Sequence, residues 1–158
     1  MTELLMPQSA SFVDVDGLQI RLIQSPSAEG IPIIATAPWP ESIYAFNLVW
    51  PQLSALGPVT AVDLPGFGMS ESRADLMSPE AMGKFLVRLM DRLEIERAHL
   101  IAPDVGTLAA LFAASNSPER FESIVGGSGG ISLDLLGEPL QQIVGSSRPD
   151  FEASDGGE

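Results

Sequence analysis

The chain has 158 residues, of which 45% are apolar and 18% are charged, so it suits one globular domain with a substantial core. Its 21 acidic and 8 basic residues give a net charge of -13, which argues against binding to nucleic acid or to an anionic membrane. The absence of cysteine excludes disulfides and thiolate metal sites within the chain. We expect a cytoplasmic protein without metal, cofactor or membrane span.

The first third of the chain predicts two edge strands, one buried strand and one helix. Ser11 to Ile23 partly alternates between polar and apolar side chains, and Asp16-Gly17 within it is a hairpin signal. The continuous apolar run from Ile31 to Ala35 is typical of a strand buried on both faces of a parallel sheet. Ser42 then provides a cap for a helix that continues to Leu56.

The middle of the chain alternates strands with helices. Ser78-Pro79-Glu80 combines a capping hydroxyl, a proline in the first turn and an acid near the positive end of the helix dipole. Apolar residues then recur at spacings of three and four, which predicts one buried helix face. The remaining elements are strands at 59–63, 98–102 and 122–125 and a helix at 105–116.

This alternation predicts an α/β fold with a mostly parallel sheet of about six strands and flanking helices. Residues 1–130 form the first domain unit in this interpretation. Residues 131–158 are expected to be either the start of a cap or a disordered acidic tail, with a possible helix from Leu135 to Val144.

The segment Ala102-Pro103-Asp104-Val105-Gly106 joins a buried strand directly to a helix through a carboxylate. Its pattern of small residue, any residue, nucleophile, any residue and glycine is that of a nucleophile elbow, with aspartate where serine is commoner. A second interpretation is that Asp104 is a helix N-cap, which accepts hydrogen bonds from free backbone N–H groups.

Several motifs in the same order resemble the first half of the α/β-hydrolase family. They are the loop Trp39-Pro40-Glu41-Ser42, the turn Asp63-Leu64-Pro65-Gly66-Phe67-Gly68-Met69-Ser70, the approach Ile95-Glu96-Arg97-Ala98-His99-Leu100 and the helix end Ser117-Pro118-Glu119-Arg120. An aspartate at the elbow resembles the branch of epoxide hydrolases and haloalkane dehalogenases. The resemblance covers residues 11 to 130 and implies a truncated α/β-hydrolase core.

The resemblance implies a role for each motif residue. Asp104 would attack an sp³ carbon of a small apolar substrate and form an alkyl ester, which water then hydrolyses. The backbone N–H groups of Trp39 and Val105 would stabilise the oxyanion, and a half-buried Trp39 side chain would line a pocket. Valine after the nucleophile lacks the aromatic N–H that grips halide in the dehalogenases, which favours epoxide opening or ester-type hydrolysis.

The same resemblance assigns a structural role to the turn after the second buried strand. Asp63, Gly66, Gly68 and Ser70 are expected to shape that turn rather than to take part in chemistry. The two glycines, without a third, are a weak phosphate-loop signal.

The base and the acid of the family come from late strands that this sequence lacks. The single histidine, His99, precedes Asp104 by five residues on the same strand, roughly 16 Å away at about 3.3 Å per residue. General-base catalysis requires about 3 Å or one bridging water. We therefore expect the chain alone to be inactive, with self-association or a complementing chain at the open sheet edge. The alternative is a non-catalytic binding or interaction module that retained the fold.

Overall fold

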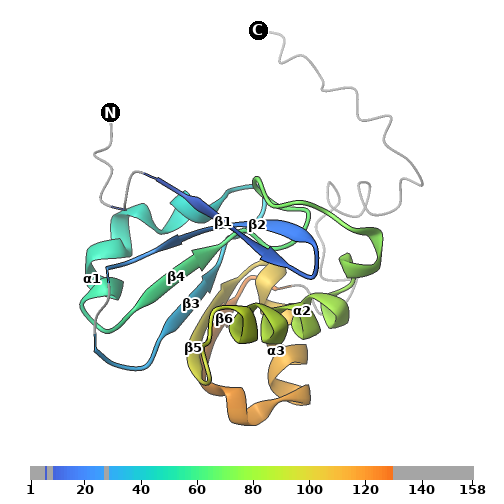
Figure 1. Cartoon of the computed structure of the whole chain (residues 1–158). Helices are drawn as coiled ribbons and strands as arrows, with labels where there is room; N and C mark the ends of the chain where they lie inside the picture. Colours follow the sequence, from blue (N-terminus) through green and yellow to red (C-terminus); the bar gives the residue numbers. More distant parts are fainter. Residues whose placement is uncertain (1–5, 7–8, 27–28, 130–158) are drawn as a thin grey trace, which may run out of the picture.

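The computed structural model describes residues 6, 9–26 and 29–129, and these contain one six-stranded sheet with helices on both faces (Figure 1). Along the sheet the strand order is β1-β2-β4-β3-β5-β6. The pairs β3–β4, β3–β5 and β5–β6 are parallel, whereas β1–β2 and β2–β4 are antiparallel. The predicted α/β fold with a mostly parallel sheet is confirmed. The strand bounds are β1 Ser11–Val15, β2 Leu18–Gln24, β3 Ile33–Thr36, β4 Val59–Val62, β5 Ala98–Pro103 and β6 Phe121–Gly127.

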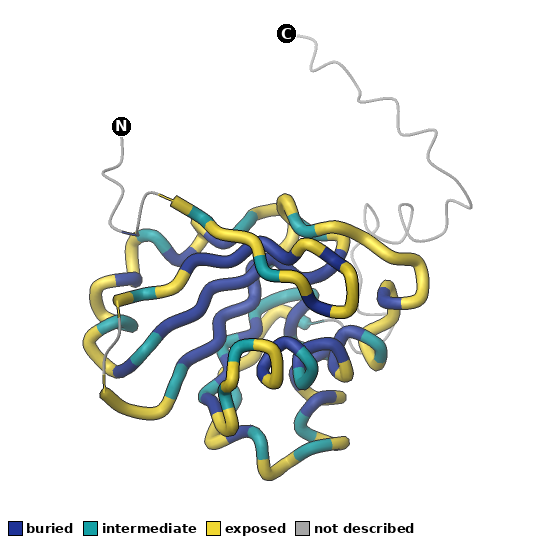
Figure 2. The backbone as a smooth tube through the Cα atoms, viewed as in Figure 1, coloured by how far each residue is buried: buried dark blue, intermediate teal, exposed yellow. Residues whose placement is uncertain are grey.

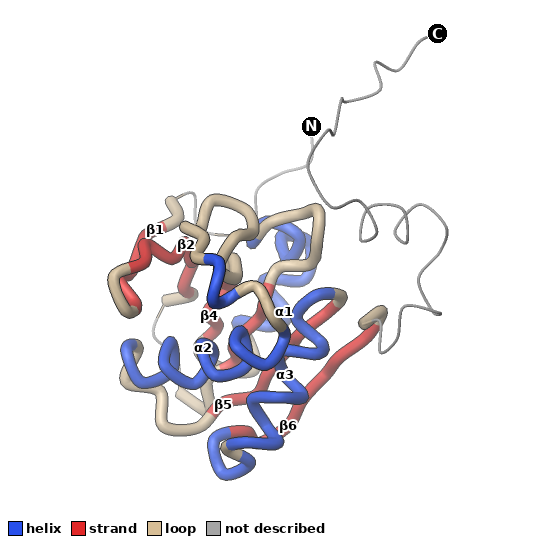
Figure 3. Tube along the Cα trace, turned by 90° about the vertical axis from the view of Figure 1, so that its right-hand side faces the viewer, coloured by secondary structure: helices blue, strands red, loops and turns tan. Residues whose placement is uncertain are grey.

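Two helical layers cover the sheet unequally. One layer consists of α2 (Pro79–Arg92) and α3 (Val105–Asn116), which lie together on one side of the strands (Figure 3). The other consists of η1 (Ile43–Val49) and α1 (Trp50–Ser54). Two short 3-10 turns complete the set, η2 at Ala74–Leu76 and η3 at Pro118–Arg120. No helix in the described part of the chain is long and apolar enough to cross a lipid bilayer.

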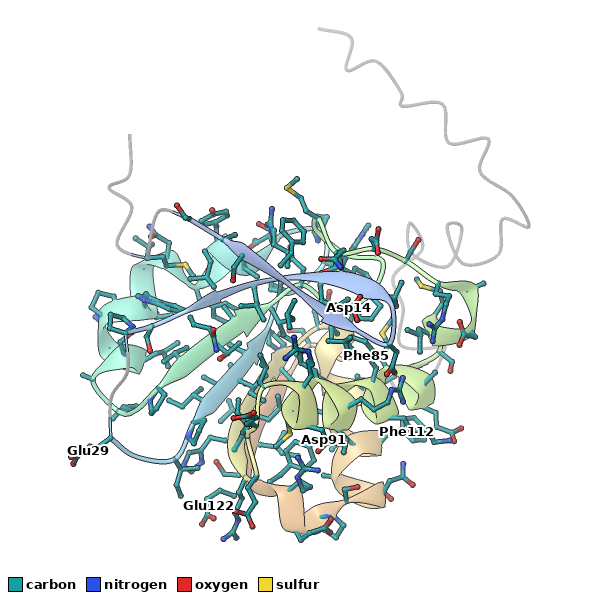
Figure 4. All side chains as sticks on the ribbon, in the orientation of Figure 1. Asp14, Glu29, Phe85, Asp91, Phe112 and Glu122 are labelled. Carbon is teal, nitrogen blue, oxygen red and sulfur yellow. The ribbon has the colours of Figure 1, made fainter. Side chains whose placement is uncertain are left out.

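The buried side chains form one cluster on each face of the sheet, and the central strands are buried throughout (Figure 2). Phe85 of α2 is fully enclosed between its helix and the sheet, whereas Phe112 of α3 is 40% exposed at the outside of the helical layer (Figure 4). Packing of α2 on α3 is close, because a Cβ atom at Gly83 would lie 2.7 Å from the carbonyl oxygen of Ala109. The start of α2 forms as predicted, with Ser78 Oγ accepting a hydrogen bond from the N–H of Ala81 at 3.2 Å.

The prediction of a single helix from Ser42 to Leu56 is wrong. The structure has instead the seven-residue 3-10 helix η1 followed by the five-residue α1, and Ser42 makes no capping hydrogen bond through its side chain. Pro51 explains the break, because it carries no N–H to continue a hydrogen-bond ladder from η1 and is tolerated only near a helix start. Strand β3 begins at Ile33 instead of Ile31, since Pro32 has no N–H for the ladder. The predicted helix from Leu135 to Val144 lies outside the described residues.

Candidate active site

The segment that joins β5 to α3 holds Asp104 in an unusual backbone conformation. Its φ of 52° and ψ of -120° belong to a region that residues other than glycine rarely adopt. The N–H of Asp104 donates to the carbonyl oxygen of Gly127 at 2.7 Å, and its own carbonyl accepts from the N–H of Thr107 at 3.0 Å. The strained residue is thus fixed at its backbone on both sides, while its side chain projects from a sharp strand-to-helix turn.

The carboxylate of Asp104 meets the loop that follows β3. Its Oδ2 accepts a hydrogen bond from the backbone N–H of Trp39 at 2.9 Å. The side chain makes no capping hydrogen bond to α3, so the N-cap interpretation does not describe its contacts. Trp39 is 47% exposed and Asp104 is partly buried, so neither residue is enclosed in the core.

Close packing behind the elbow holds it against the end of β3. A Cβ atom at Gly106 would lie 2.0 Å from Oγ1 of Thr36, so no larger residue fits at that position unless the Thr36 side chain moves. Thr36 is fully buried, and its hydroxyl has no hydrogen-bond partner among the described residues. Thr107 links the two last strands, since its Oγ1 lies 2.7 Å from the carbonyl oxygen of Ala102 and 3.0 Å from that of Gly127, and either carbonyl can accept its single proton.

These two threonines were not singled out from the sequence. Each is a polar residue within a run of small or apolar residues, and this is the only feature of the sequence that could have pointed to them. The partner of Thr107 on β6 lies 20 residues further along the chain. Such a contact follows from the pairing of β5 with β6, and not from any local pattern.

The turn after β4 is organised around a second carboxylate. Asp63 is fully buried, and it accepts hydrogen bonds from the N–H groups of Ile43 at 2.9 Å and Met69 at 3.1 Å. Ser70 Oγ donates to the carbonyl oxygen of Asp63 at 2.7 Å and accepts from the N–H of Arg21 at 2.8 Å. The structure thus places Asp63 and Ser70 as organisers of the turn that joins β2, β4 and η1.

The glycines of this turn have separate reasons to be glycine. Gly66 and Gly68 have φ values of 83° and 54°, which favour glycine. A Cβ atom at Gly68 would lie 2.0 Å from Oδ2 of Asp63, so the carboxylate also needs the bare backbone. Gly68 is therefore packed tightly on Asp63, whereas Gly66 borders Met77. Among the described residues, no hydrogen bond or ion pair joins Asp63 to Asp104.

His99 is not part of the elbow. It is the second residue of β5, whereas Asp104 follows the last residue of that strand, and its Nδ1 lies 2.8 Å from Ser123 Oγ on β6. His99 and Ser123 line a cavity of about 370 Å³ together with apolar side chains of β3, α1, β5 and β6, including Ile101 and Val125. Among the described residues, no group of three or more histidine and acidic side chains is arranged to hold a metal ion.

Known proteins share this architecture. Residues 41–152 match the family model described as the alpha/beta hydrolase fold. The chain superposes on wild-type Cfl2 from Burkholderia cenocepacia with a TM-score of 0.73 and 32% identity, covering 82% of this chain and 44% of that one.

The curated relatives carry different enzyme names. A 2-hydroxymuconate semialdehyde hydrolase of Pseudomonas sp. CF600 is 36% identical over 63% of this chain and 36% of its own length. A haloalkane dehalogenase of Agrobacterium fabrum is 29% identical over 68% of this chain and 35% of its own. A juvenile hormone epoxide hydrolase of Manduca sexta is 29% identical over 67% of this chain and 26% of its own. The chain thus spans less than half the length of these relatives. With the sheet order and the matched family model together, the chain belongs to the α/β hydrolase fold family.

Proposed function

We propose that this chain supplies the nucleophile of an epoxide hydrolase-like enzyme, with Asp104 as the attacking residue. The observation that carries the proposal is the carboxylate of Asp104 at a positive-φ turn, hydrogen-bonded to the N–H of Trp39 at 2.9 Å. A carboxylate in that position can reach a substrate above the carboxyl edge of the sheet, where open α/β sheets bind ligands.

The reaction divides into two steps. In the first, one oxygen of Asp104 forms a bond to an epoxide carbon as the carbon–oxygen bond of the ring breaks, giving an alkyl ester and an alkoxide that takes up a proton from water. In the second, water attacks the ester carbonyl, and the N–H groups of Trp39 and Val105 stabilise the tetrahedral oxyanion. Collapse of that intermediate releases a diol and restores the carboxylate.

The second step needs a base to activate water. His99 is the only histidine of the sequence, and it lies at the opposite end of β5 from Asp104. We infer that the base and its orienting acid come from polypeptide other than these 158 residues. The first step requires neither group, so the chain alone should form the ester and hydrolyse it slowly.

Epoxides are favoured over alkyl halides as substrates. The residue after Asp104 is Val105, whose side chain has no N–H with which to hold a departing halide. An epoxide keeps its leaving oxygen attached to the substrate and needs only a proton donor. Relatives of the chain include both an epoxide hydrolase and a haloalkane dehalogenase, and the choice between them rests on this side chain.

Mass spectrometry of the chain incubated with styrene oxide tests the proposal. We expect one adduct of the mass of the epoxide on the peptide that contains Asp104, and its absence in Asp104→Asn. Asp91→Asn is the matched control, because Asp91 is an exposed aspartate on α2 that pairs with Arg120 at the surface. An adduct that persists in Asp104→Asn would refute the assignment. Rapid multiple turnover by the wild-type chain would refute the inference that the base is supplied from elsewhere.

The edge of the sheet favours a second candidate, a binding module whose partner covers β6. Val125 of β6 is 63% exposed, and the cavity beside it is lined mainly by apolar side chains. Exposed strand edges template pairing with another chain. A second copy at this edge would give a concentration-dependent mass in light scattering after size exclusion. Such association without an adduct at Asp104 would favour the binding module, whereas a mass that stays that of the monomer at all concentrations would contradict a second copy at β6.

A further inference from the structure

A second cavity, of about 510 Å³, lies between the loop after β3 and the turn after β4. Its lining includes Arg21, Glu41, Ser42, Tyr44 and Met69, and it includes neither Asp104 nor Trp39. The cavity therefore does not belong to the candidate active site, although the loop after β3 borders both.

Arg21 is the one cationic group in this lining, and it is almost completely buried. Its side chain is only 8% exposed, and its guanidinium carbon lies 5.6 Å from the centre of the Tyr44 ring. An arginine at this position of a strand is unusual, because arginine is seldom fully buried without partners for its N–H groups.

The guanidinium is neutralised by a neighbour but does not have its hydrogen bonds completed. Its Nε lies 2.8 Å from Oδ2 of Asp63, an ion pair in which the fully enclosed N–H does not point at an acceptor. The same Asp63 carboxylate already accepts from the N–H groups of Ile43 and Met69. Among the described residues, nothing accepts a hydrogen bond from the Arg21 guanidinium. Buried donors without acceptors are costly, and in most proteins such a group is satisfied by water or by a ligand.

We propose that this cavity binds the carboxylate of a small organic acid, with Arg21 as the anion-binding group. A carboxylate can take two parallel N–H donors of a guanidinium at once, which matches the donors that Arg21 leaves unused. Tyr44 and Met69 supply an aromatic and a flexible apolar wall for the rest of the ligand. Ser42, whose side chain makes no helix-capping hydrogen bond, offers a hydroxyl donor in the same lining.

The two carboxylates near Arg21 oppose a dianion more strongly than a monoanion. Asp63 offsets the charge of the guanidinium from below, and Glu41 is an exposed carboxylate in the lining. A phosphate dianion would meet the repulsion of both carboxylates with one cation to oppose it. A monocarboxylate with an apolar body has one charge to place and gains contact with Tyr44.

The single tyrosine of the chain provides a specific probe. A chain labelled with 3-fluorotyrosine gives one ¹⁹F signal, which we expect to shift and saturate on titration with benzoate. Benzyl alcohol, a neutral ligand of similar shape, and inorganic phosphate serve as comparison ligands, and both should bind at least about tenfold more weakly than benzoate. Equal affinity for benzoate and benzyl alcohol would overturn the proposal, because the carboxylate would then contribute nothing.

Three variants separate binding from folding. Glu41→Gln removes repulsion from the lining and should tighten benzoate binding about threefold, whereas Glu119→Gln, at an exposed position in η3, should leave it unchanged. Arg21→Gln should abolish benzoate binding, and its folding is checked by circular dichroism because it leaves Asp63 without its ion pair. If Arg21→Gln does not fold, the Glu41→Gln result decides. Unchanged affinity in that variant would overturn the proposal, and the adduct at Asp104 does not bear on it.

Discussion

Asp63 and Asp104 both follow buried parallel strands at the carboxyl edge of the sheet, yet their surroundings differ sharply. Asp63 is fully buried, accepts two backbone N–H groups and pairs with Arg21. Asp104 is partly buried, accepts one N–H, and stands on a strained backbone. A carboxylate whose hydrogen bonds are completed serves the fold. A carboxylate left with an unused oxygen and an open approach remains available for chemistry.

Replacing each aspartate by asparagine should give the largest difference in stability between the two sites. Asp63→Asn leaves Arg21 buried without a counter-charge and should lower the free energy of unfolding by about 3 to 5 kcal/mol. Asp104→Asn keeps the shape of a partly exposed side chain and should change it by less than about 1 kcal/mol. Urea unfolding followed by circular dichroism measures both. Similar losses in the two variants would contradict the division into a structural and a chemical carboxylate.

Two glycine substitutions test how tightly the Asp63 carboxylate is packed against its own turn. Gly17→Ala places a Cβ atom in open space at a φ of 80°, so it should reveal only the cost of that backbone conformation, about 1 to 2 kcal/mol. Gly68→Ala adds a clash with the Asp63 carboxylate at a φ of 54° and should cost more than Gly17→Ala. Differential scanning calorimetry of both variants gives the difference. Equal shifts in Tm for the two variants would mean that the Asp63 carboxylate moves away from the added Cβ atom at no cost in stability.

The strain at Asp104 is isolated by comparing two replacements of one residue. Asp104→Gly and Asp104→Ala both lose the hydrogen bond from Trp39, but only glycine adopts the conformation with φ at 52° easily. The glycine variant should therefore be more stable than the alanine variant by about 1 to 3 kcal/mol. Chemical unfolding curves for the pair test this. An alanine variant as stable as the glycine variant would show that the elbow relaxes once the carboxylate is gone.

A third kind of carboxylate, exposed on a helix, should show the smallest effect. The hydrogen bond and the charge of Lys84 lower the pKa of Glu80 below its usual value. The pair thus stabilises the fold above the unfolded pKa of Glu80, and that contribution is lost as the pH falls through the lowered folded pKa. Glu80→Gln should reduce stability slightly at pH 7 and match the wild-type chain in acid. Urea midpoints measured across this pH range, with Glu119→Gln as control, would detect a pH-independent difference if the pair is silent.

The sequence was sufficient for the parts of the fold that depend on local pattern. The apolar runs of β3, β4 and β5, the capped start of α2 and the elbow pattern around Asp104 are each contained in a short segment. The order of the strands was not predicted, because it depends on which distant segments pair in the sheet. The helix predicted from Ser42 to Leu56 is divided near Pro51, whose missing N–H matters more there than the capping hydroxyl of Ser42.

The contacts that shape the two carboxylates could not be derived in the same way. Arg21 reaches Asp63 across 42 residues of sequence, counted from positions 21 and 63, and Trp39 reaches Asp104 across 65. Nothing near Arg21 indicates that it is buried, since strand residues beside it alternate only in part. Such pairs depend on which strands become neighbours, which is a property of the whole sheet.

The pairing of β3 with β5 acts as a ruler for the candidate site. Ala35 of β3 lies opposite Ile101 of β5. Trp39 follows Ala35 by four residues, in the loop after β3, and Asp104 follows Ile101 by three residues, directly after β5. A slip of one residue would displace the amide from the carboxylate by about 3.3 Å, enough to abolish their hydrogen bond. The loop after β3 and the elbow after β5 therefore depend on each other. Grafted together onto another sheet with the same register they would keep the hydrogen bond between Trp39 and Asp104, whereas either one grafted alone would lose it.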